Sequence, residues 1–286
     1  MTHGTVIGLL HPGEMGAAVG RCLSQHGHTV LWASEGRGAA TAARARAAAL
    51  SDAGSAAELA RRADVILSVC PPHAALDTAR SVAGFQGVFA DANAVSPASA
   101  RKIAALIESG GGSYVDGGII GLPPGEAPGT RLYLSGTRSA EVRDLFTGTA
   151  VDARTIDGGT SAASAVKMAY AAWTKGTAAL VLAARALARA EGVEETLLGE
   201  WALSQPAMAD RSRAAARAST MKGWRWIAEM EEIAASMAAD GLPEGFHLAA
   251  AEIFRRSPGA GSADPGEPAL DRVLAALTGD SAAEGS

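Results

Sequence analysis

The sequence predicts an α/β fold in its N-terminal half, followed by an all-helical C-terminal domain. Short apolar runs alternate with alanine-rich helical stretches up to about residue 155, an order typical of a parallel, doubly wound sheet. After Ile156 the strand pattern stops and only helical periodicity continues. We therefore expect a sheet domain over residues 1–158, a helical domain over 159–256, and a loop, a short helix and a flexible tail over 257–286.

Composition narrows the class of protein. Of the 286 residues, 48% are apolar and 19% are charged, with a formal net charge of −5 and two cysteines. The apolar content suffices for a buried core, and the net charge gives no basic footprint for nucleic acid or an anionic membrane. Without a membrane span, a secretory leader or a disulfide framework, we expect a cytoplasmic protein that acts on a small molecule.

Each element follows from these patterns in order. The expected strands are Thr5–Leu10, Thr29–Ala33, Asp64–Val69, Gly87–Asp91, Ser113–Asp116, Arg131–Ser135 and Val151–Arg154. The expected helices of the sheet domain are Glu14–Gln25, Ala39–Leu50, Ala74–Val82 and Pro97–Ser109. Ser55 followed by Glu58 is typical of a capping box that opens a further short helix. Ser161–Glu191 is expected to form one helix of about 46 Å that joins the two domains.

A glycine-containing turn follows the first strand directly. Dinucleotide-binding (Rossmann) folds need a tight turn here, an amide that approaches the pyrophosphate, and a small residue where the helix meets the sheet. Gly13 and Gly16 fill the second and third places, and His11 stands where the first glycine is expected. The phosphates would lie at the N-terminus of the helix, where free amides and the helix dipole favour anions. We expect this turn to bind the cofactor through His11, Pro12, Gly13, Glu14, Met15 and Gly16.

The end of the second strand bears on the choice between NAD and NADP. A carboxylate there binds the ribose 2′-hydroxyl of NAD, whereas polar and basic groups accommodate the 2′-phosphate of NADP. We align Ser34 with the acidic position, so that Ser34 and Arg37 hold a 2′-phosphate with Thr41 nearby. NADP is therefore expected, and Glu35 keeps NAD as the alternative. The ends of the next strands are expected to complete the cofactor site with Val69, Cys70, Pro71 and Asn93.

Four segments in the expected order resemble the β-hydroxyacid dehydrogenase superfamily, which includes 3-hydroxyisobutyrate and 6-phosphogluconate dehydrogenases. Ile7–Gly16 resembles its opening motif with the G-x-M-G ending, and Asp91–Pro97 resembles its D-x-S-T-x-S-P segment. Val115–Gly121 resembles its D-A-P-V-S-G-G segment, and Lys167 matches its catalytic lysine. The resemblance covers about residues 5–190. Beyond them it is architectural, and closest to a less characterised bacterial branch with a divergent C-terminal half.

The resemblance implies hydride transfer between a nicotinamide and a small carbonyl or alcohol, with Lys167 as the general acid/base. It also implies a homodimer formed through the helical domain. Helical spacing puts Tyr170 and Thr174 on the Lys167 face, and we expect Tyr170 and Asn93 to assist catalysis. Asp116 is expected to organise a loop over residues 117–121 whose amides face the substrate. The predicted substrate-binding residues are thus Asp116, Gly117, Gly118, Ile119, Gly121 and Thr174.

Several positions depart from the superfamily pattern. The asparagine one turn after the lysine falls on Ala171, the serine of the third motif on Ile120, and a later lysine on Glu231. These changes disfavour a simple 3-hydroxyacid and favour a more apolar or cationic carbonyl, or an imine. An imine reductase and a nucleotide-binding regulatory or scaffold protein without chemistry are the alternatives. We predict no metal site, because no His, Cys and carboxylate spacing supports one.

Two helical stretches of the C-terminal half carry apolar side chains that are expected to pack against other helices or a partner chain. The long helix carries apolar residues on most faces, including Trp173, Leu180, Val181 and Leu182, which favours a dimer. A later stripe is expected in a core or a dimer interface: Trp224, Trp226, Met230, Ile233 and Met237. Glu229, Glu231 and Glu232 form either a solvated face or part of a pocket, and His247 is expected to be structural.

Overall fold

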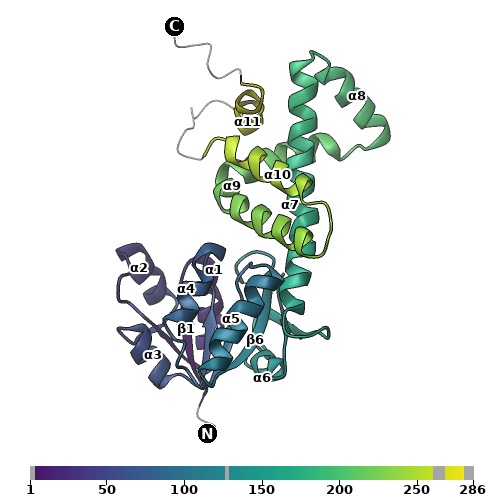
Figure 1. The fold of residues 1–286 in the computed structure, drawn as a ribbon. Helices are drawn as coiled ribbons and strands as arrows, with labels where there is room; N and C mark the ends of the chain where they lie inside the picture. The colour runs from purple at the N-terminus through teal and green to yellow at the C-terminus, as the bar shows by residue number, and fades with distance from the viewer. Residues whose placement is uncertain (1–3, 126–128, 260–267, 280–286) are drawn as a thin grey trace. The chain divides into compact units, whose positions relative to one another are not determined.

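The computed structural model describes residues 4–125, 129–259 and 268–279. They divide into two compact units, residues 1–168 (the sheet unit) and 169–286 (the helical unit), and the division falls inside the long helix α7, Ala162–Ala190. The fold class predicted from the sequence is confirmed, with an α/β unit followed by an all-helical one (Figure 1).

The sheet unit contains one sheet of eight strands in the order β3-β2-β1-β4-β5-β6-β7-β8. The strands are β1 Val6–Leu10, β2 Thr29–Trp32, β3 Ser51–Asp52, β4 Val65–Ser68, β5 Val88–Asp91, β6 Ser113–Ile120, β7 Thr130–Ser135 and β8 Val151–Thr155. The chain builds outward from β1 to β3, then returns to β4 on the other side of β1, so the topological switch point lies between β1 and β4. Open α/β sheets bind their ligands outside the carboxyl ends of the strands at such a point.

The expectation of an all-parallel sheet is wrong at β6 and β7, which pair antiparallel with Gly118 opposite Tyr133. The expected loop over residues 117–121 is likewise strand as far as Ile120. Only residues 121–129 separate β6 from β7. A parallel crossover needs a dozen or more residues, so this short connection makes a hairpin instead.

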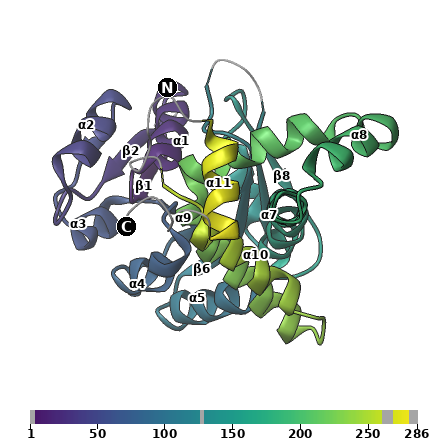
Figure 2. The same ribbon diagram turned by 90° about the horizontal axis from the view of Figure 1, so that it is seen from above.

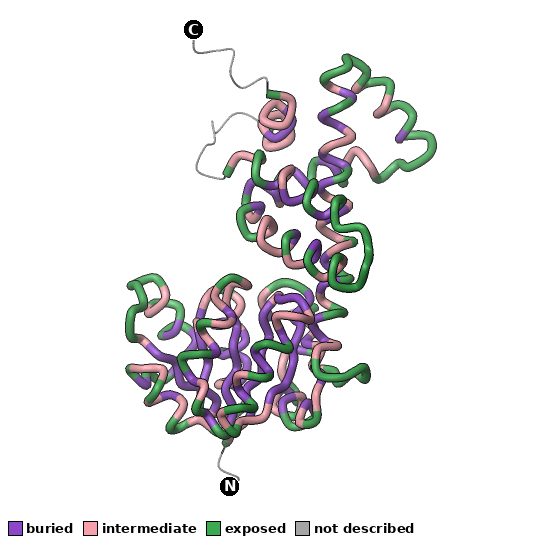
Figure 3. Tube along the Cα trace, in the orientation of Figure 1, coloured by how far each residue is buried: buried purple, intermediate pink, exposed green. Residues whose placement is uncertain are grey.

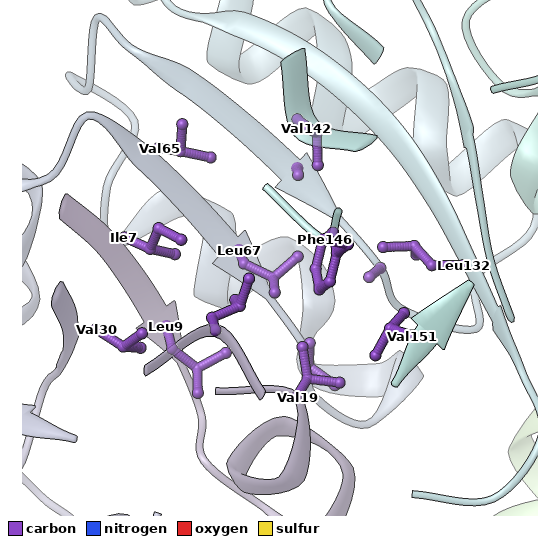
Figure 4. Close-up of a cluster of buried hydrophobic side chains, with 14 of the residues drawn as sticks. Ile7, Leu9, Val19, Val30, Val65, Leu67, Leu132, Val142, Phe146 and Val151 are labelled. Carbon is purple, nitrogen blue, oxygen red and sulfur yellow. The ribbon is translucent and has the colours of Figure 1, made fainter. Parts of the chain in front are cut away.

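Helices cover both faces of the sheet, as Figure 2 shows. One face packs against α1 Glu14–Gln25, α2 Ala39–Ala47 and α6 Ser139–Asp144, and the other against α3 Ala56–Arg62, α4 Ala75–Arg80 and α5 Pro97–Ser109. Because side chains alternate along a strand, each face has its own apolar cluster. In the first, Ile7 and Leu9 of β1 meet Val19 of α1 and Phe146 (Figure 4). The central strands β1, β4, β5 and β6 are therefore almost entirely buried, whereas the edge strands β3 and β8 are largely exposed or half-buried (Figure 3).

Local signals account for several helix bounds. Helices α1 and α5 have the bounds predicted for them, and Pro97 occupies the first turn of α5 behind the N-cap Ser96. The predicted cap of α3 is confirmed, because the Ser55 hydroxyl accepts a hydrogen bond from the Glu58 amide at 3.1 Å. The two-residue strand β3 and the short helix α6 were not expected from the sequence.

The helical unit contains the rest of α7, followed by α8 Glu194–Ser204, α9 Met208–Ala239, α10 Gly245–Arg256 and α11 Ala269–Thr278. In residues 169–259 and 268–279 there is no strand, and α11 is the short helix expected near the C-terminus. Buried Leu182, Trp201 and Val273 share one apolar cluster. Most of the loop predicted over 257–268, and the tail from residue 280, lie outside the described residues. In the described part of the chain, no helix is both long enough and apolar enough to span a membrane.

Candidate functional site

The turn after β1 has the form of a dinucleotide-binding turn, with a histidine in its first position. His11 has a φ of 66°, the left-handed conformation that usually requires glycine. Histidine is among the few other residues enriched in that region. A Cβ on Gly16 would lie 2.9 Å from the His11 carbonyl oxygen, so α1 can approach the turn this closely only with glycine there.

The same turn offers room and polarity for a diphosphate. Gly13 is the N-cap of α1 and, having no side chain, leaves the first amides of the helix uncapped. Apart from its chain neighbours, the nearest atom to a Cβ on Gly13 would be His11 Cδ2, at 3.7 Å. Pro12 is buried, Met15 packs against the core, and Glu14 is exposed. The residues present therefore fit an anionic group bound by backbone amides at the start of α1.

Two arginines reach this turn from the β2 side. The guanidinium of Arg37 lies 2.8 Å from His11 Nδ1, after a tight turn in which the Arg37 amide donates to the Ser34 carbonyl. Arg44 of α2 donates to the Pro12 carbonyl at 3.4 Å and to the Thr41 hydroxyl at 3.0 Å. Ser34, Arg37 and Thr41, the three residues aligned with the 2′-phosphate, thus flank the glycine turn. Arg44 was missed, since its only sequence signal is its place one helical turn after Thr41.

The surroundings of His11 favour the neutral form of its imidazole. Burial lowers its pKa below the ordinary value, and the positive charges of Arg37 and Arg44 and the neighbouring His73 lower it further. A neutral ring keeps one nitrogen free to accept a hydrogen bond, which is what a guanidinium donor requires. The imidazole therefore accepts from Arg37 instead of repelling it.

The ends of β4 and β5 are tied together by Asn93. Its Oδ1 accepts a hydrogen bond from the Cys70 amide at 2.5 Å, and its Nδ2 donates to the Ser68 hydroxyl at 3.0 Å. Asn93 is buried, so these partners occupy much of the hydrogen-bonding capacity that we assigned to cofactor and substrate. Val69 lies against the first turn of α1, 3.5 Å from the position of a Cβ on Gly16, and Pro71 opens the short 3₁₀ helix Pro72–Ala74. Burial raises the pKa of the Cys70 thiol.

Asp116 anchors the first turn of α7 to the sheet. Its carboxylate accepts hydrogen bonds from the Ser164 amide at 2.7 Å and the Ser164 hydroxyl at 2.6 Å. The Ser135 hydroxyl donates to the same carboxylate at 3.4 Å and accepts from the Ala163 amide at 3.2 Å. Asp116 has no exposed surface. The structure therefore shows Asp116 holding the helix that carries Lys167, in the middle of β6 rather than at a strand end.

Lys167 lies against the distal part of β6. Its Nζ donates a hydrogen bond to the Ile119 carbonyl at 2.8 Å, and burial lowers its pKa to about 8. A Cβ on Gly118 would lie 2.8 Å from the Ala163 carbonyl oxygen and 3.1 Å from Lys167 Cβ. Gly118 therefore permits the close approach of α7 to β6. The structure thus places Lys167 beside Gly118 and Ile119, which belong to a strand instead of the expected loop, and Asp116 holds the preceding turn of the same helix.

These groups share one edge of the sheet. Strands β1, β4, β5 and β6 are parallel neighbours, with Asp91, the last residue of β5, opposite Asp116. The turn after β1, Cys70 after β4, Asn93 after β5 and Ile119 in the last part of β6 accordingly lie at the carboxyl ends of the strands. Gly117 and Gly121 bracket this part of β6, and Gly121 has a φ of 119°.

Tyr170 and Thr174 follow Lys167 along α7, in the helical unit. Tyr170 is exposed, and Ala171, at the position of the superfamily asparagine, is buried. The Thr174 hydroxyl donates to the Tyr170 carbonyl at 3.0 Å, which leaves its oxygen able to accept a hydrogen bond. The expected roles of both residues toward the substrate remain predictions.

The acidic stretch of α9 separates into two environments. Glu229 forms an ion pair with Lys175 of α7, and each side chain is only 14% exposed. Glu231 instead pairs with Arg255 at the surface, at 2.9 Å. In the nearby stripe Met230 and Ile233 are buried, whereas Trp224 is exposed. A solvated face thus describes Glu231 but is wrong for Glu229.

His247 is buried in the helical unit, where burial lowers its pKa. Over the described ranges no group of three or more His, Cys, Asp or Glu side chains is arranged to hold a metal ion.

Comparison with known proteins gives a family for the sheet domain. A family model described as the NAD binding domain of 6-phosphogluconate dehydrogenase matches residues 5–147, half of the chain. A second, described as Domain of unknown function (DUF1932), matches residues 188–257. No curated protein matches the chain.

Solved structures share the fold at low sequence identity. A conserved hypothetical protein from Sinorhizobium meliloti is 24% identical over 96% of this chain and 98% of its own, with a TM-score of 0.74. A Mycobacterium tuberculosis 3-hydroxyisobutyrate dehydrogenase with L-serine is 20% identical over 96% of this chain and 99% of its own, with a TM-score of 0.72. A reductive aminase from Aspergillus terreus, in complex with NADPH4, cyclohexanone and allyl amine, is 20% identical over 94% and 98%, with a TM-score of 0.57.

Proposed function

The chain belongs to the β-hydroxyacid dehydrogenase-like superfamily, with an NAD(P)-binding domain and a dehydrogenase-like fold, and we propose that it is an NADP-dependent oxidoreductase of a small carbonyl or alcohol. One observation carries the proposal of activity. Lys167, at the position of the superfamily's catalytic lysine, is an ammonium group in a desolvated place at the ligand-binding edge of the sheet. A lysine with a lowered pKa in such a position is typical of acid–base catalysis.

Lys167 would hold and move the proton of the reaction. When bound, the nicotinamide supplies or accepts the hydride. Reduction of a carbonyl leaves charge on its oxygen, which requires a proton donor beside it. The Ile119 carbonyl accepts one of the three N–H groups of the Lys167 ammonium and so orients it, leaving two for a substrate oxygen or a water. With a pKa of about 8, the group gives up and regains a proton readily near neutral pH.

The arginines at the turn support NADP over NAD. Arg37 and Arg44 bring two cations beside the Ser34–Arg37 turn, where a 2′-phosphate would lie. Charge-assisted hydrogen bonds from guanidinium groups to phosphate are among the stronger polar contacts. We therefore propose that Ser34 and Arg37 hold the 2′-phosphate and that Arg44 contributes its charge.

Turnover tests the proposed function. Purified protein is assayed for NADPH and NADH oxidation with a panel of carbonyls and with the same carbonyls plus amines. Oxidation with carbonyls alone, lost in Lys167→Met, supports the proposal. NADPH or NADH oxidation that requires an amine favours the imine reductase. This candidate is motivated by the departures from the superfamily pattern at Ala171 and Ile120. Dinucleotide binding without turnover on either panel would mean a nucleotide-binding protein without this chemistry.

We also propose a homodimer formed through the helical unit. Four exposed apolar residues of α7, Tyr170, Trp173, Leu180 and Leu187, are 45–71% exposed. With Thr177 and Ala184 between them, they alternate spacings of three and four residues, the pattern of a helix seam that packs against another helix. Val181 and Leu182, by contrast, are buried within the unit itself.

Light scattering tests this assembly. We expect twice the chain mass at micromolar concentration, since obligate homodimers bury about 2,000 Å² or more. Leu180→Glu should halve the measured mass. Leu203→Glu, at an even more exposed leucine outside the seam, is the matched control and should leave it unchanged. A monomeric wild-type protein would contradict the proposal.

A further inference from the structure

We propose that His11 is a phosphate-binding residue, whose hydrogen-bonding form is set by Arg37. The inference deepens the proposed dinucleotide function and rests on it. It concerns the one position of the turn where this chain has a bulky side chain in place of the expected glycine. The ligand group is a phosphate oxygen, from either the diphosphate common to both dinucleotides or the 2′-phosphate of NADP.

Arg37 fixes which imidazole nitrogen carries the proton. A guanidinium has hydrogen-bond donors only, so its contact of 2.8 Å makes His11 Nδ1 the acceptor. In the neutral ring the proton then resides on Nε2. His11 is therefore prepared to donate from Nε2 while its other nitrogen is occupied.

The donor side of the ring lies over the open face of Gly13. A Cβ on Gly13 would be 3.7 Å from His11 Cδ2 and 4.0 Å from Nε2, and apart from its chain neighbours these are the nearest atoms. Gly13 is also the N-cap of α1, where the uncapped amides favour an anion. The imidazole N–H and the helix amides thus face the same space.

The charges around His11 favour an anion as its partner. Arg37 contacts the ring, Arg44 and His73 lie near enough to lower its pKa, and Glu14 is the acidic residue in the first turn of α1. Burial and the three basic neighbours together lower the pKa of the imidazole. A neutral ring with Nδ1 occupied by Arg37 has its Nε2–H available for an anion such as a phosphate oxygen.

The backbone conformation makes the inference testable. A φ of 66° is unfavourable for histidine and costs glycine nothing, so His11→Gly should stabilise the free protein if the turn is otherwise unchanged. The same substitution should weaken phosphate binding. A variant that is more stable but binds phosphate more weakly would identify His11 as a binding residue instead of one that only completes the turn. His11→Asn is a second variant, because asparagine also tolerates this conformation but has no imidazole.

The test is titration of the wild-type protein, both variants and Arg37→Ala by calorimetry, with thermal unfolding measured in parallel. The probes are ADP, which carries a diphosphate, 2′,5′-ADP, which carries a 2′-phosphate, and NADH and NADPH. We expect binding to both His11 variants to be about 10-fold weaker or more, as for other losses of a hydrogen bond to a charged group. A double variant that combines His11→Gly with Arg37→Ala is titrated as well, and its loss should be smaller than the sum of the two single losses, because the two residues act as a pair.

The pattern across probes identifies the phosphate. Losses confined to 2′,5′-ADP and NADPH assign His11 to the 2′-phosphate, and losses that include ADP and NADH assign it to the diphosphate. Wild-type affinity in both variants, with every probe that the wild-type protein binds, overturns the inference and leaves the proposed function standing. A wild-type protein that binds none of the four probes overturns both.

Discussion

The glycine turn and the Lys167 region lie at the same edge of the sheet but are built in opposite ways. At the turn, the groups that face a ligand are backbone amides and arginines, and Arg37 and Arg44 are exposed. At Lys167, the supporting groups are buried: Asp116 and Ser164 have no exposed surface, and Gly118 is in contact with α7. One region presents charge to solvent, and the other removes it from solvent.

Because of this difference, the two regions should respond to different solution conditions. Exposed charges are screened by salt, so binding at the turn should weaken as ionic strength rises. A desolvated lysine instead changes its proton affinity, so its contribution depends on pH. Cofactor binding and proton transfer should therefore be separable by substitution and by solution conditions.

The largest effect is expected at the proton donor. Lys167→Met keeps the bulk of the side chain and removes the acid, and turnover should fall by about 10²–10⁴-fold, as for the loss of general acid–base catalysis. Fluorescence titration should give nearly the wild-type affinity for NADPH. Lys102→Met, at an exposed lysine of α5, is the matched control. Turnover close to normal in the Lys167 variant would move the acid elsewhere, with Tyr170 the next residue to test.

The next effect is expected at the turn. Arg37→Ala should weaken NADPH binding by about 1.5–3 kcal/mol through the loss of a charge-assisted hydrogen bond, with a much smaller change for NADH. The salt dependence of NADPH binding should become shallower. Arg46→Ala, at another exposed arginine of α2, provides the comparison. Equal weakening of both dinucleotides would argue against a 2′-phosphate contact.

A smaller, structural effect is expected where α7 meets β6. Gly118→Ala adds a methyl group 2.8 Å from a backbone oxygen, so the helix must move. We expect a loss of about 1–3 kcal/mol in the free energy of unfolding, together with lower turnover, because Lys167 moves with the helix. Gly84→Ala has open space around its Cβ and should be nearly neutral in urea unfolding. Unchanged turnover in a destabilised Gly118 variant would show that the position of Lys167 does not depend on this contact.

The smallest effect is a pH profile. With a pKa of about 8, Lys167 loses its proton as the pH rises through that value. Reduction needs the ammonium, so its rate should fall above about pH 8, whereas oxidation needs the neutral amine and should accelerate through the same range. The residual activity of Lys167→Met should not show this change in rate around pH 8. Parallel profiles for the two directions would be inconsistent with one acid/base group.

The sequence was most informative where a local signal decides the structure. Pro97 behind Ser96 marks the start of α5, and Gly13 and Gly16 mark the start of α1. The helical position of Lys167 followed from its motif and its spacing. These features depend on neighbours within one or two turns of the chain.

Features that depend on contacts between residues far apart in the sequence could not be predicted from it. A loop was expected over residues 117–121, after a strand end at Asp116, whereas pairing with β7 makes residues 117–120 strand. The hydrogen bonds between Asp116 and Ser164 and between Asn93 and Cys70 join residues 48 and 23 positions apart in the sequence. The neighbouring sequence gives no signal for either of them. Arg44 belongs with these, because only the fold of α2 against the turn brings it to Pro12.

The position of the boundary between the two units affects how the protein can evolve. The division falls after Met168, one residue beyond Lys167, so the dinucleotide turn, the acid and the Asp116–Ser164 anchor are all part of the sheet unit. Substitutions confined to the helical unit would leave the Asp116–Ser164 anchor and the contact of Lys167 with the Ile119 carbonyl in place. A chimera that exchanges only residues after 168 should therefore keep the proposed proton donor where the sheet unit holds it.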